Sequence, residues 1–505
     1  MPESTLVKSV HGNSEEPERG RVVVLGAGPA GLGAAYRLAR EGRFAITVIE
    51  RNAVVGGNAG SFELAGLRVD YGSHRLHPSC DAEVLADIRG LLGEDLLDRP
   101  RHGRILLQGR WIHFPLKPID LLLRLPPVFS LRVARDIVSG SFRSAARAVG
   151  AGGRGDTGGE AVSPGASFSS ILAASLGPTI ARDFYIPYAR KIWGVDPDEL
   201  DPVQARRRVS ANSPAKLVRK VLASVPGLKP AGAGRFFYPR GGFGRISERF
   251  ADAAVAAGVE LVLGAGVREV RHEDDGTFTV VSDHAGSLRE HHADHLWSTI
   301  PISVLAEVFR PRAPAEVLAA GAGVELRAML LVYLVLDQDR FSEYDAHYFP
   351  EPDVAVTRIS EPKNYSVMHE PVGRTVLCAE LPCSKDGPEW KASEEELAGI
   401  VGRALENAGL PLRSKVVETA VRRLPQAYPI YRKGFDEHFA RLDEWSGSVR
   451  NLLSFGRQGL FAHDNTHHAL FMAYCACDCL DARGVFDERR WADYRKVFET
   501  HVVED

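Results

Sequence analysis

The segment that most constrains the fold of this 505-residue chain lies near its N-terminus. Residues Arg21–Leu25 (RVVVL) form a short β-branched run, and a glycine-rich turn follows. The next stretch, AGLGAAYRLAREG, carries small and apolar residues at helical spacing and stops at Gly42, and Ala45–Glu50 (AITVIE) is a second apolar run. Apolar strands of this kind are typical of a sheet that is buried on both faces. The pattern predicts a β-α-β unit with a parallel sheet and a right-handed crossover.

The turn itself indicates a dinucleotide site. It reads Gly26-Ala-Gly28-Pro29-Ala30-Gly31, and Glu50 ends the second strand. The first glycine permits the tight turn, the second lets the backbone approach a pyrophosphate, and the third lets the helix pack on the strand. The helix N-terminus offers free N–H groups to the phosphates, and the carboxylate of Glu50 can accept hydrogen bonds from ribose hydroxyls.

Composition narrows the class of protein. Lys and Arg number 62 against 65 Asp and Glu, so the formal net charge is −3, which argues against a nucleic-acid binder. No apolar run approaches the roughly 20 residues that span a bilayer. Residues 1–18 read as a disordered polar leader without the apolar core of a signal peptide, and the six cysteines do not form a disulfide framework. We therefore expect a cytoplasmic enzyme with a small-molecule substrate, and the sequence leaves a homodimer open.

Beyond Glu50 the chain departs from a nicotinamide-binding domain. Arg51 is followed by Gly56, Gly57 and Asn58 and then by a short strand pair (SFELAGLRVDYGSH). This order resembles the FAD-binding proteins of the glutathione-reductase-like superfamily, on its amine-oxidase and protoporphyrinogen-oxidase side. The resemblance implies FAD as the cofactor, with Arg51 and the double glycine near its phosphates and ribitol. We recognise no covalent attachment motif, so we expect the FAD to be non-covalent.

Four later motifs extend the resemblance over nearly the whole chain. They are Tyr71-Gly-Ser-His74-Arg-Leu-His77, Tyr188-Ala-Arg-Lys-Ile-Trp193-Gly194, Tyr238-Pro-Arg240-Gly-Gly242 and Gly456-Arg457-Gln-Gly459. Their order is similar to that of the UDP-galactopyranose mutase-like branch. The resemblance implies these cofactor-binding residues: Gly26, Gly28, Pro29, Ala30, Gly31, Glu50, Arg51, Gly56, Gly57, Asn58, His74, Val267, Gly456, Arg457, His467 and His468.

The same resemblance implies the arrangement of domains. We expect an α/β fold in which residues 19–115, 235–305 and 445–505 assemble a Rossmann-type, glutathione-reductase-like FAD-binding domain from discontinuous segments. Residues 116–234 and 306–444 would form an inserted mixed α/β substrate-binding domain. Residues 141–167 are dense in Gly, Ala and Ser and read as a flexible loop. The run PIDLLLRLPPVF (118–129) is broken by prolines, so a lid or buried wall is favoured over a membrane contact.

Histidines are the candidate proton carriers, because imidazole titrates near neutral pH. We select His74, His77 and His463; for the first two the alternative is a hydrogen bond to flavin or loop backbone only. The run His463-Asp464-Asn465-Thr466-His467-His468 lies at a glycine turn and helix start, so we expect flavin or substrate contacts or helix capping and no metal. The candidate substrate-binding residues, with surface charge or packing as the alternative, are Tyr188, Trp193, Arg240, Arg358, Asn364, Tyr428 and Tyr431.

Three functions follow from the resemblance. The first is an FAD-dependent oxidoreductase that transfers hydride from a small polar metabolite to flavin N5, the metabolite being a sugar, nucleotide sugar or sugar-derived natural product. The second is a redox-neutral flavin isomerase of nucleotide sugars; here Ala462 stands where mutases carry an arginine that pairs with phosphate. The third is a non-enzymatic binder similar to the Rab GDP-dissociation inhibitors, which the intact glycine motif and Glu50 disfavour. The sequence leaves the electron acceptor open.

Overall fold

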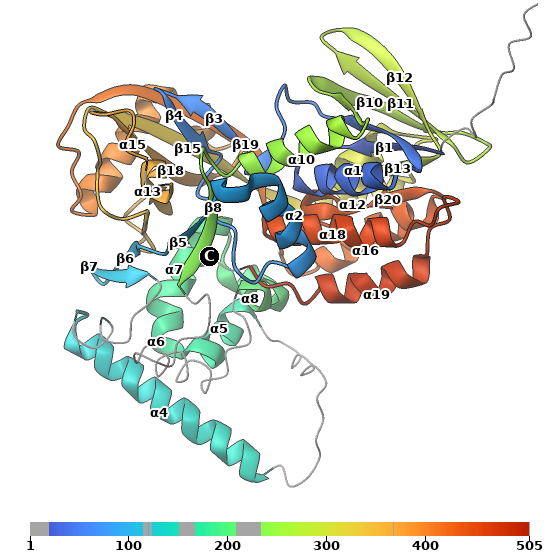
Figure 1. Cartoon of the computed structure of the whole chain (residues 1–505). Coiled ribbons are helices and arrows are strands. Elements are labelled where there is room, and N and C mark those ends of the chain that lie inside the picture. Colours follow the sequence, from blue (N-terminus) through green and yellow to red (C-terminus); the bar gives the residue numbers. More distant parts are fainter. Residues whose placement is uncertain are drawn as a thin grey trace, which may run out of the picture.

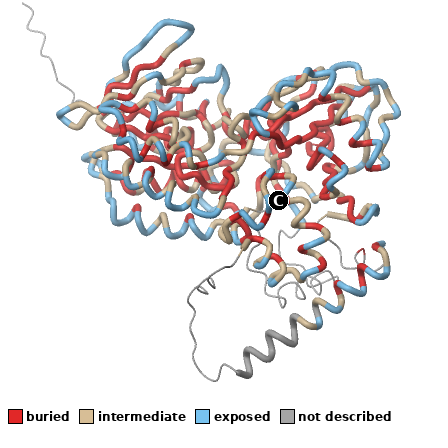
Figure 2. Tube along the Cα trace, turned by 180° about the vertical axis from the view of Figure 1, so that it is seen from behind, coloured by how far each residue is buried: buried red, intermediate tan, exposed pale blue. Residues whose placement is uncertain are grey.

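The computed structural model describes residues 20–114, 120, 124–150, 167–208, 234–366 and 368–503, with the side chains of 137, 140–150 and 208 left out. Over this part of the chain the protein is a mixed α/β structure with three larger sheets (Figure 1). Buried residues gather in the interior of two larger parts of the molecule, which we call the first and second lobes, as the tube in Figure 2 shows. The leader (1–18) lies outside the described residues.

A five-stranded sheet contains the predicted β-α-β unit. Its order is β20-β13-β1-β2-β9, and each neighbouring pair is parallel. Helix α1 (Pro29–Glu41) connects β1 to β2 and ends at Gly42, which has φ 67°. The strands are β1 (Gly20–Leu25), β2 (Phe44–Ile49), β9 (Glu260–Val262), β13 (His295–Ser298) and β20 (Leu452–Ser454). Segments far apart in sequence therefore form one sheet around β1.

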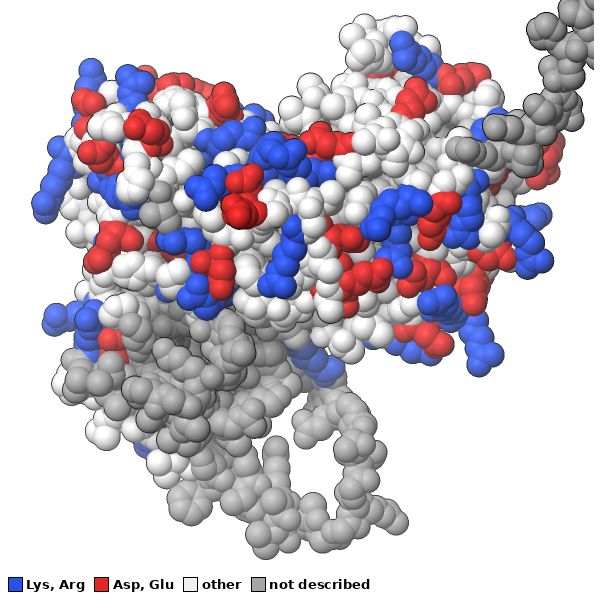
Figure 3. All heavy atoms as spheres, in the orientation of Figure 1, with Lys and Arg blue, Asp and Glu red and all other residues white. Residues whose placement is uncertain are grey.

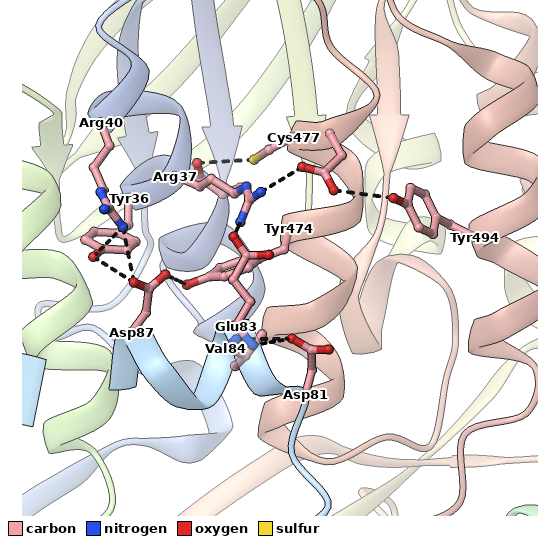
Figure 4. Close-up of polar contacts among 12 residues, drawn as sticks. Tyr36, Arg37, Arg40, Asp81, Glu83, Val84, Asp87, Tyr474, Cys477 and Tyr494 are labelled. Carbon is pink, nitrogen blue, oxygen red and sulfur yellow. Dashed lines mark hydrogen bonds and ion pairs between the residues drawn. The ribbon is translucent and has the colours of Figure 1, made fainter. Parts of the chain in front are cut away.

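Polar contacts hold the helices on one side of this sheet together (Figure 4). Arg37 of α1 bridges Glu83 of α2 (Ala82–Leu92) and Asp478 of α18 (Thr466–Asp478). Tyr474 of α18 donates a hydrogen bond to Asp87 of α2 at 2.6 Å. Cys475, Cys477 and Cys479 are buried free thiols in this layer, in keeping with a role as small apolar residues. The contacts fix α1 and α18, whose N-termini both meet the site described below.

A four-stranded sheet lies beside the parallel sheet. Its order is β12-β11-β10-β14, with bounds Ser287–Ala293, Phe278–His284, Ala265–His272 and Phe309–Arg310. Strands β10 and β11 form a hairpin whose loop contains Asp275 and Gly276, and the carboxylate of Asp275 accepts a hydrogen bond from the backbone N–H of Thr277 at 2.9 Å. The pairing of β10 and β11 shifts between Val267 and Glu269, which marks a β-bulge.

The second lobe is built on a seven-stranded sheet of order β19-β15-β18-β17-β16-β6-β7. Strand β15 (Glu325–Leu336) is buried along nearly its whole length between β18 and β19. Helix α15 (Glu394–Asn407) covers one face through Leu397, Val401 and Leu405. The other strands are β19 (Val416–Ile430), β18 (Thr375–Cys383), β17 (Arg358–Ser360), β16 (Ala346–Tyr348), β6 (Gly103–Leu107) and β7 (Arg110–Phe114).

The opposite face of this sheet receives an early part of the chain. The hairpin of β3 (Ser61–Leu64) and β4 (Leu67–Asp70) packs through Leu67, Val69 and Tyr71 against Leu331 and Tyr333 of β15. The hydroxyl of Tyr333 donates to the backbone carbonyl of Asp70 at 2.7 Å. The loop after β4, which carries His74, is thereby held between the two lobes.

Helices complete the second lobe: α4 (Pro127–Gly150), α5 (Phe168–Leu176), α6 (Pro178–Ile180), a π-helical turn (Ala181–Tyr185), α7 (Ile186–Trp193) and α8 (Pro202–Arg208). Helix α4 corrects the predicted loop at 141–167, because it continues to Gly150; residues 151–166 lie outside the described chain. Lys191 of α7 donates to the carbonyls of Phe349, Glu351 and Val354, each at 2.6 Å. It thus ties α7 to the loop after β16.

The remaining elements join the lobes. The helices are α10 (Arg245–Ala256), α11 (Ile302–Val308), α12 (Ala315–Gly323), α13 (Pro362–Tyr365), α14 (Pro388–Lys391), α16 (Phe435–Ser448), α17 (Gly456–Gly459) and α19 (Glu488–Phe498), and the strands are β5 (Leu96–Pro100) and β8 (Arg235–Pro239). Among the described helices none is long and apolar enough to span a bilayer. Both signs of charge are interspersed over the face in Figure 3, as the near-zero net charge implies.

Candidate active site

A cavity of about 880 Å³ runs between the parallel sheet and the seven-stranded sheet. One end is lined by the glycine turn after β1 and by Glu50, and the other by residues of β17 and β19. Of the predicted site residues, it brings together Gly26, Gly28, Pro29, Ala30, Glu50, Arg51, Gly57, Asn58, His74, Val267, Arg358, Tyr428, Arg457 and His463.

The glycine turn has the geometry that its spacing predicts. Gly26 has φ 99°, a conformation that L-residues with a side chain rarely adopt. A Cβ added to Gly31 would lie 1.9 Å from the carbonyl oxygen of Gly26, so this position serves helix–strand packing and does not line the cavity. A Cβ on Gly28 would meet no protein atom within 4 Å, and Gly28 does line the cavity. The backbone at Gly28 is therefore open to a ligand.

Glu50 is buried at the end of β2. One carboxylate oxygen accepts from the backbone N–H of Ala27 at 2.9 Å, and the other accepts from the backbone N–H of Asn52 at 2.9 Å. These bonds fix the carboxylate beside the glycine turn, and Arg51, which is exposed, lines the cavity next to it. The arrangement matches the ribose-binding role that the sequence indicates.

The double glycine joins this turn to the loop before β3. The backbone N–H of Gly56 donates to the carbonyl of Ala27 at 2.8 Å, while Gly57 and Asn58 line the cavity. Gly56 itself has φ 106° and serves the turn. Val267 reaches the cavity from the β-bulge in β10.

His74 lies at the junction of the two lobes. Its Nε2 is 3.0 Å from the carbonyl oxygen of Asn58 and 2.9 Å from that of Tyr71. Because carbonyls only accept, Nε2 carries the hydrogen and Nδ1 holds the lone pair of the neutral ring. Burial lowers the pKa of His74 despite the nearby carboxylate of Asp70. At neutral pH His74 is therefore a neutral imidazole whose Nδ1 is a proton acceptor.

The other two candidate proton carriers differ in position. His77 lies outside the cavity lining, where its Nδ1 pairs with the hydroxyl of Ser79 at 2.7 Å. His463 is buried and lines the cavity, and the amide of Gln204 donates to its Nδ1 at 3.2 Å. That bond leaves the hydrogen of a neutral His463 on Nε2. The structure thus brings His74 and His463, but not His77, to the cavity.

The histidines at the start of α18 form a separate cluster with the C-terminal tail. His501 pairs with the buried carboxylate of Asp464 at 3.1 Å, and His468 accepts from the backbone N–H of Asn465 at 3.2 Å while stacking on His501. Burial raises the pKa of Asp464, but the hydrogen bond from His501 and the charges of His468, His501 and Arg207 outweigh it, and the net pKa is lowered. His467 and His468 do not line the cavity.

Asp464, His468 and His501 place potential metal-ligating atoms within 4.8 Å of one another. Nδ1 of His468 is occupied as a helix cap, and the guanidinium of Arg207 lies 3.7 Å from the carboxylate of Asp464. A cation beside the carboxylate disfavours a metal ion there. We therefore assign the cluster to anchoring the tail at 499–503, where Val503 reaches the cavity.

The second glycine turn, at the start of α17, also meets the site. Gly456 has φ 78°, and a Cβ there would lie 2.7 Å from the Cβ of Ala30, so it serves close packing of α17 against α1. Arg457 lines the cavity, donates to the carbonyl of Ala427 at 2.6 Å and lies over the ring of Tyr428 at 5.1 Å. Tyr428 also lies 5.1 Å from the ring of His463, so it forms a wall of the cavity.

Five predicted substrate-binding residues lie outside the cavity lining. Arg240 is mostly exposed and pairs with Asp95, and the Asn364 amide donates to the carbonyls of Ser342 and Tyr344, both at 2.9 Å. Tyr431 donates to the carbonyl of Phe461 and accepts from the N–H of His463, both at 2.9 Å. Trp193 packs against Phe168, and Tyr188 stacks on Phe184. The sequence predicted that these five residues bind substrate; in the structure their contacts are those of the alternative, which was packing or surface charge.

The cavity also contains residues that sequence reasoning missed: Phe62, Ser73, Arg75, Thr299, Arg422, Gln426, Gln458 and Val503. Ser73 and Arg75 flank His74, so the motif around His74 could have indicated them as site residues. Arg422 and Gln426 carry no local signal, because they reach the cavity only through the register of β19 against β15.

Comparison with known proteins now identifies the family. The model of the family described as flavin containing amine oxidoreductase matches residues 29–436, well over half of the chain. The chain belongs to this family. Membership confirms the sequence prediction of a flavoprotein with FAD as cofactor and of an oxidoreductase family.

Curated relatives match only in part. Phytoene dehydrogenase of Streptomyces griseus is 44% identical over 78 residues, which is 15% of each chain. The putative flavin-containing monoamine oxidase AofH of Mycobacterium tuberculosis is 28% identical over 263 residues, 52% of this chain and 53% of AofH. The matched segments thus span about half or less of these relatives.

Solved structures share the fold at low identity. Reduced UDP-galactopyranose mutase superposes with a TM-score of 0.73 at 21% identity, over 91% of this chain and 93% of the mutase. A putative protoporphyrinogen oxidase from Exiguobacterium sp. 255-15 gives 0.66 at 19% identity, over 91% and 98%. These similarities confirm the predicted mixed α/β fold, whereas the predicted amine-oxidase side of the superfamily is confirmed by the family match over residues 29–436.

The residues present fit FAD. No side chain caps the N-terminus of α1, the site above Gly28 is open, and the carboxylate of Glu50 lines the same end of the cavity. An uncapped helix N-terminus suits the pyrophosphate and a carboxylate suits the ribose.

Proposed function

We propose that the protein is an FAD-dependent oxidase or dehydrogenase of a small polar metabolite. The observation that carries the proposal is the continuity of the cavity, which extends from the glycine turn and Glu50 to His74, Tyr428 and His463. A dinucleotide at the first end would reach the second, where a substrate and proton-transferring groups can meet it. Non-covalent FAD supplies the hydride-accepting chemistry when it is bound.

In this proposal one lobe binds FAD and the other binds the substrate. The segments around the parallel sheet form the FAD-binding domain, and the seven-stranded sheet with helices α4 to α8 forms the inserted substrate-binding domain. The loop after β4 belongs to the first in sequence but packs on the second through Tyr71. It therefore positions His74 where cofactor and substrate would adjoin.

His74 is the proposed proton acceptor. Its Nε2–H is held by the carbonyls of Asn58 and Tyr71, so the lone pair of Nδ1 has a fixed direction. Oxidation of a C–H bond beside a hydroxyl or amine requires a base for the O–H or N–H proton, and a neutral imidazole provides one. His463, with its hydrogen on Nε2, is the proposed hydrogen-bond donor to substrate.

The test starts with the visible spectrum of the purified protein before and after denaturation, followed by anaerobic mixing with candidate metabolites. We expect flavin bands that pass into the soluble fraction on denaturation and that bleach with a substrate. Product formation that requires prior flavin reduction, with no net electron transfer, would instead support the redox-neutral isomerase. A colourless protein that takes up no FAD would contradict both enzymes and favour the binding protein.

The proposal includes a small molecule as the partner and a cytoplasmic location, with no nucleic-acid partner and no membrane attachment. The charge balance argues against a nucleic-acid partner, because 62 basic residues are offset by 65 acidic ones. Size-exclusion chromatography with light scattering would decide between a monomer and the homodimer that the sequence leaves open.

A further inference from the structure

The cavity is strongly basic. Six arginines line it (Arg51, Arg75, Arg358, Arg422, Arg423 and Arg457) against two acidic residues, Glu50 and Asp464. Glu50 lies at the nucleotide end, and Asp464 is paired with His501. The end formed by the seven-stranded sheet therefore presents cationic groups with no acidic residue among the described lining residues.

Most of these arginines are held by protein groups. Arg358 forms a bidentate pair with Glu380, and Arg75 pairs with Asp345 at 3.3 Å. Arg423 donates to the carbonyls of Trp390 and Ala392 at 3.0 and 2.6 Å. Each of these three guanidinium groups is therefore already bonded to acceptors of the protein.

Arg422 differs from them. Its guanidinium carbon lies 4.1 Å from the ring centre of Phe62 and 4.4 Å from that of Tyr71. Its Nε is buried without a hydrogen-bond partner, and no carboxylate lies within ion-pair distance among the described residues. Aromatic rings contact the flat face of a guanidinium and leave its N–H edge for hydrogen bonds. Stacking therefore holds the group in place without neutralising it.

Arg422 lies in the part of the cavity where we propose that the substrate binds. It stacks on Tyr71, and the carbonyl of that same residue accepts the hydrogen bond from His74. Arg422 and the proposed proton acceptor His74 therefore both contact Tyr71, and Arg422 reaches it from strand β19 of the seven-stranded sheet. The glycine turn and Glu50, which serve the nucleotide, line the other end of the cavity.

We propose that the substrate carries an anionic group, a carboxylate or a phosphate, and that the N–H edge of Arg422 binds it. This inference rests on the proposed function and adds the charge class of its substrate. Charge-assisted hydrogen bonds from arginine to these anions are about twice as strong as neutral ones, and their planar geometry matches the guanidinium edge. A polyamine would meet the same cation with repulsion, which selects against cationic substrates.

The experiment measures ligand binding to the FAD-loaded protein through perturbation of its visible flavin bands. The probes are benzoate for a carboxylate, methyl phosphate for a phosphate and putrescine for a cationic amine. Wild type is compared with Arg422→Met and Arg422→Lys. The matched control is Arg423→Met, which removes the neighbouring arginine on the same strand, where the guanidinium is held by carbonyls.

We expect at least one anion to bind, and Arg422→Met to raise its Kd by about tenfold or more. Arg422→Lys retains charge but loses the planar fork, so its Kd should lie between those of wild type and Arg422→Met. Arg423→Met should bind like wild type, and putrescine should leave the bands unchanged. Which anion binds tells carboxylate from phosphate.

Unchanged anion affinity in Arg422→Met, no binding of either anion, or preferred binding of putrescine would each overturn the inference. If Arg422→Met fails to retain FAD, the lysine variant and the salt dependence of the wild-type Kd decide, because an ionic contact weakens as salt screens it. The two levels of failure are distinct. Reduction of the bound flavin by cationic amines would contradict only this inference. Failure of the protein to take up FAD would contradict the proposed function itself.

Discussion

Arg358 and Glu380 form a bidentate ion pair at the edge of the cavity, with Nη2 of Arg358 at 2.8 and 3.0 Å from the two carboxylate oxygens. The same carboxylate accepts a hydrogen bond from the backbone N–H of Ser73 at 2.8 Å. Glu380 therefore joins two strands of the seven-stranded sheet to the loop that carries His74. The pair is nearly buried, with 11% and 5% of the side chains exposed.

Replacing one partner should be costly. Glu380→Gln removes the charge that balances Arg358, and breaking a buried pair from one side costs about 3 kcal/mol in free energy of unfolding. Urea unfolding followed by circular dichroism measures this. The control is Asp493→Asn, which breaks an exposed pair with Lys496 and should leave the midpoint unchanged. Equal effects of the two substitutions would contradict a special role for the buried pair.

Substitutions of two glycines in the first turn should have different effects, one on FAD binding and the other on the stability of the fold. Gly28→Ala places a methyl group in open space at the cavity, so the thermal midpoint of the apoprotein should hold while the Kd for FAD rises about tenfold. Gly31→Ala places its methyl group against the carbonyl of Gly26, so the apoprotein itself should lose about 1–3 kcal/mol. Fluorescence titration with FAD and calorimetry of both apoproteins provide the measurements. The idea fails if Gly28→Ala unfolds the protein or if Gly31→Ala is as stable as wild type.

The protonation state of His74 should determine how activity falls with decreasing pH. As pH falls through its pKa, which burial holds below the ordinary value, Nδ1 is protonated and can no longer accept a proton. Activity should therefore be full at neutral pH and lost towards acid with an apparent pKa below about 6.5. His74→Gln should lower kcat by about 10²- to 10³-fold and remove that pH dependence.

The matched control for that prediction is His77→Gln, because His77 lies on the same loop outside the cavity lining. It should preserve both kcat and the pH profile. A wild-type profile in His74→Gln would show that this histidine only orients the loop.

Lys191 should stabilise the second lobe. Its ammonium donates to three carbonyls of the loop at 349–354, so Lys191→Met leaves these acceptors buried without a donor. We expect a loss of about 2–3 kcal/mol in free energy of unfolding. Lys496→Met, at an exposed lysine on α19, is the control for loss of a positive charge. If both variants melt at the wild-type temperature, the carbonyl cluster contributes nothing measurable.

The sequence by itself determined the local geometry of this protein. The apolar run at Arg21–Leu25, the helix that ends at Gly42 and the glycines at 26, 28 and 31 specify the β-α-β unit, because backbone freedom and side-chain periodicity act within a few residues. Motifs of the same range indicated His74, His463 and Arg457, since each lies within a few residues of the end of a strand or helix.

Tertiary structure alone decided which residues meet. Arg422 reaches Tyr71 only because β19 pairs with β15 in one register, and a shift by one residue would turn its side chain to the other face. Glu380 meets Ser73 and Asp464 meets His501 for the same kind of reason, since packing joins segments that share no sequence pattern. Local sequence encodes backbone conformation and burial, whereas the charge and shape of the cavity follow from how distant elements pack.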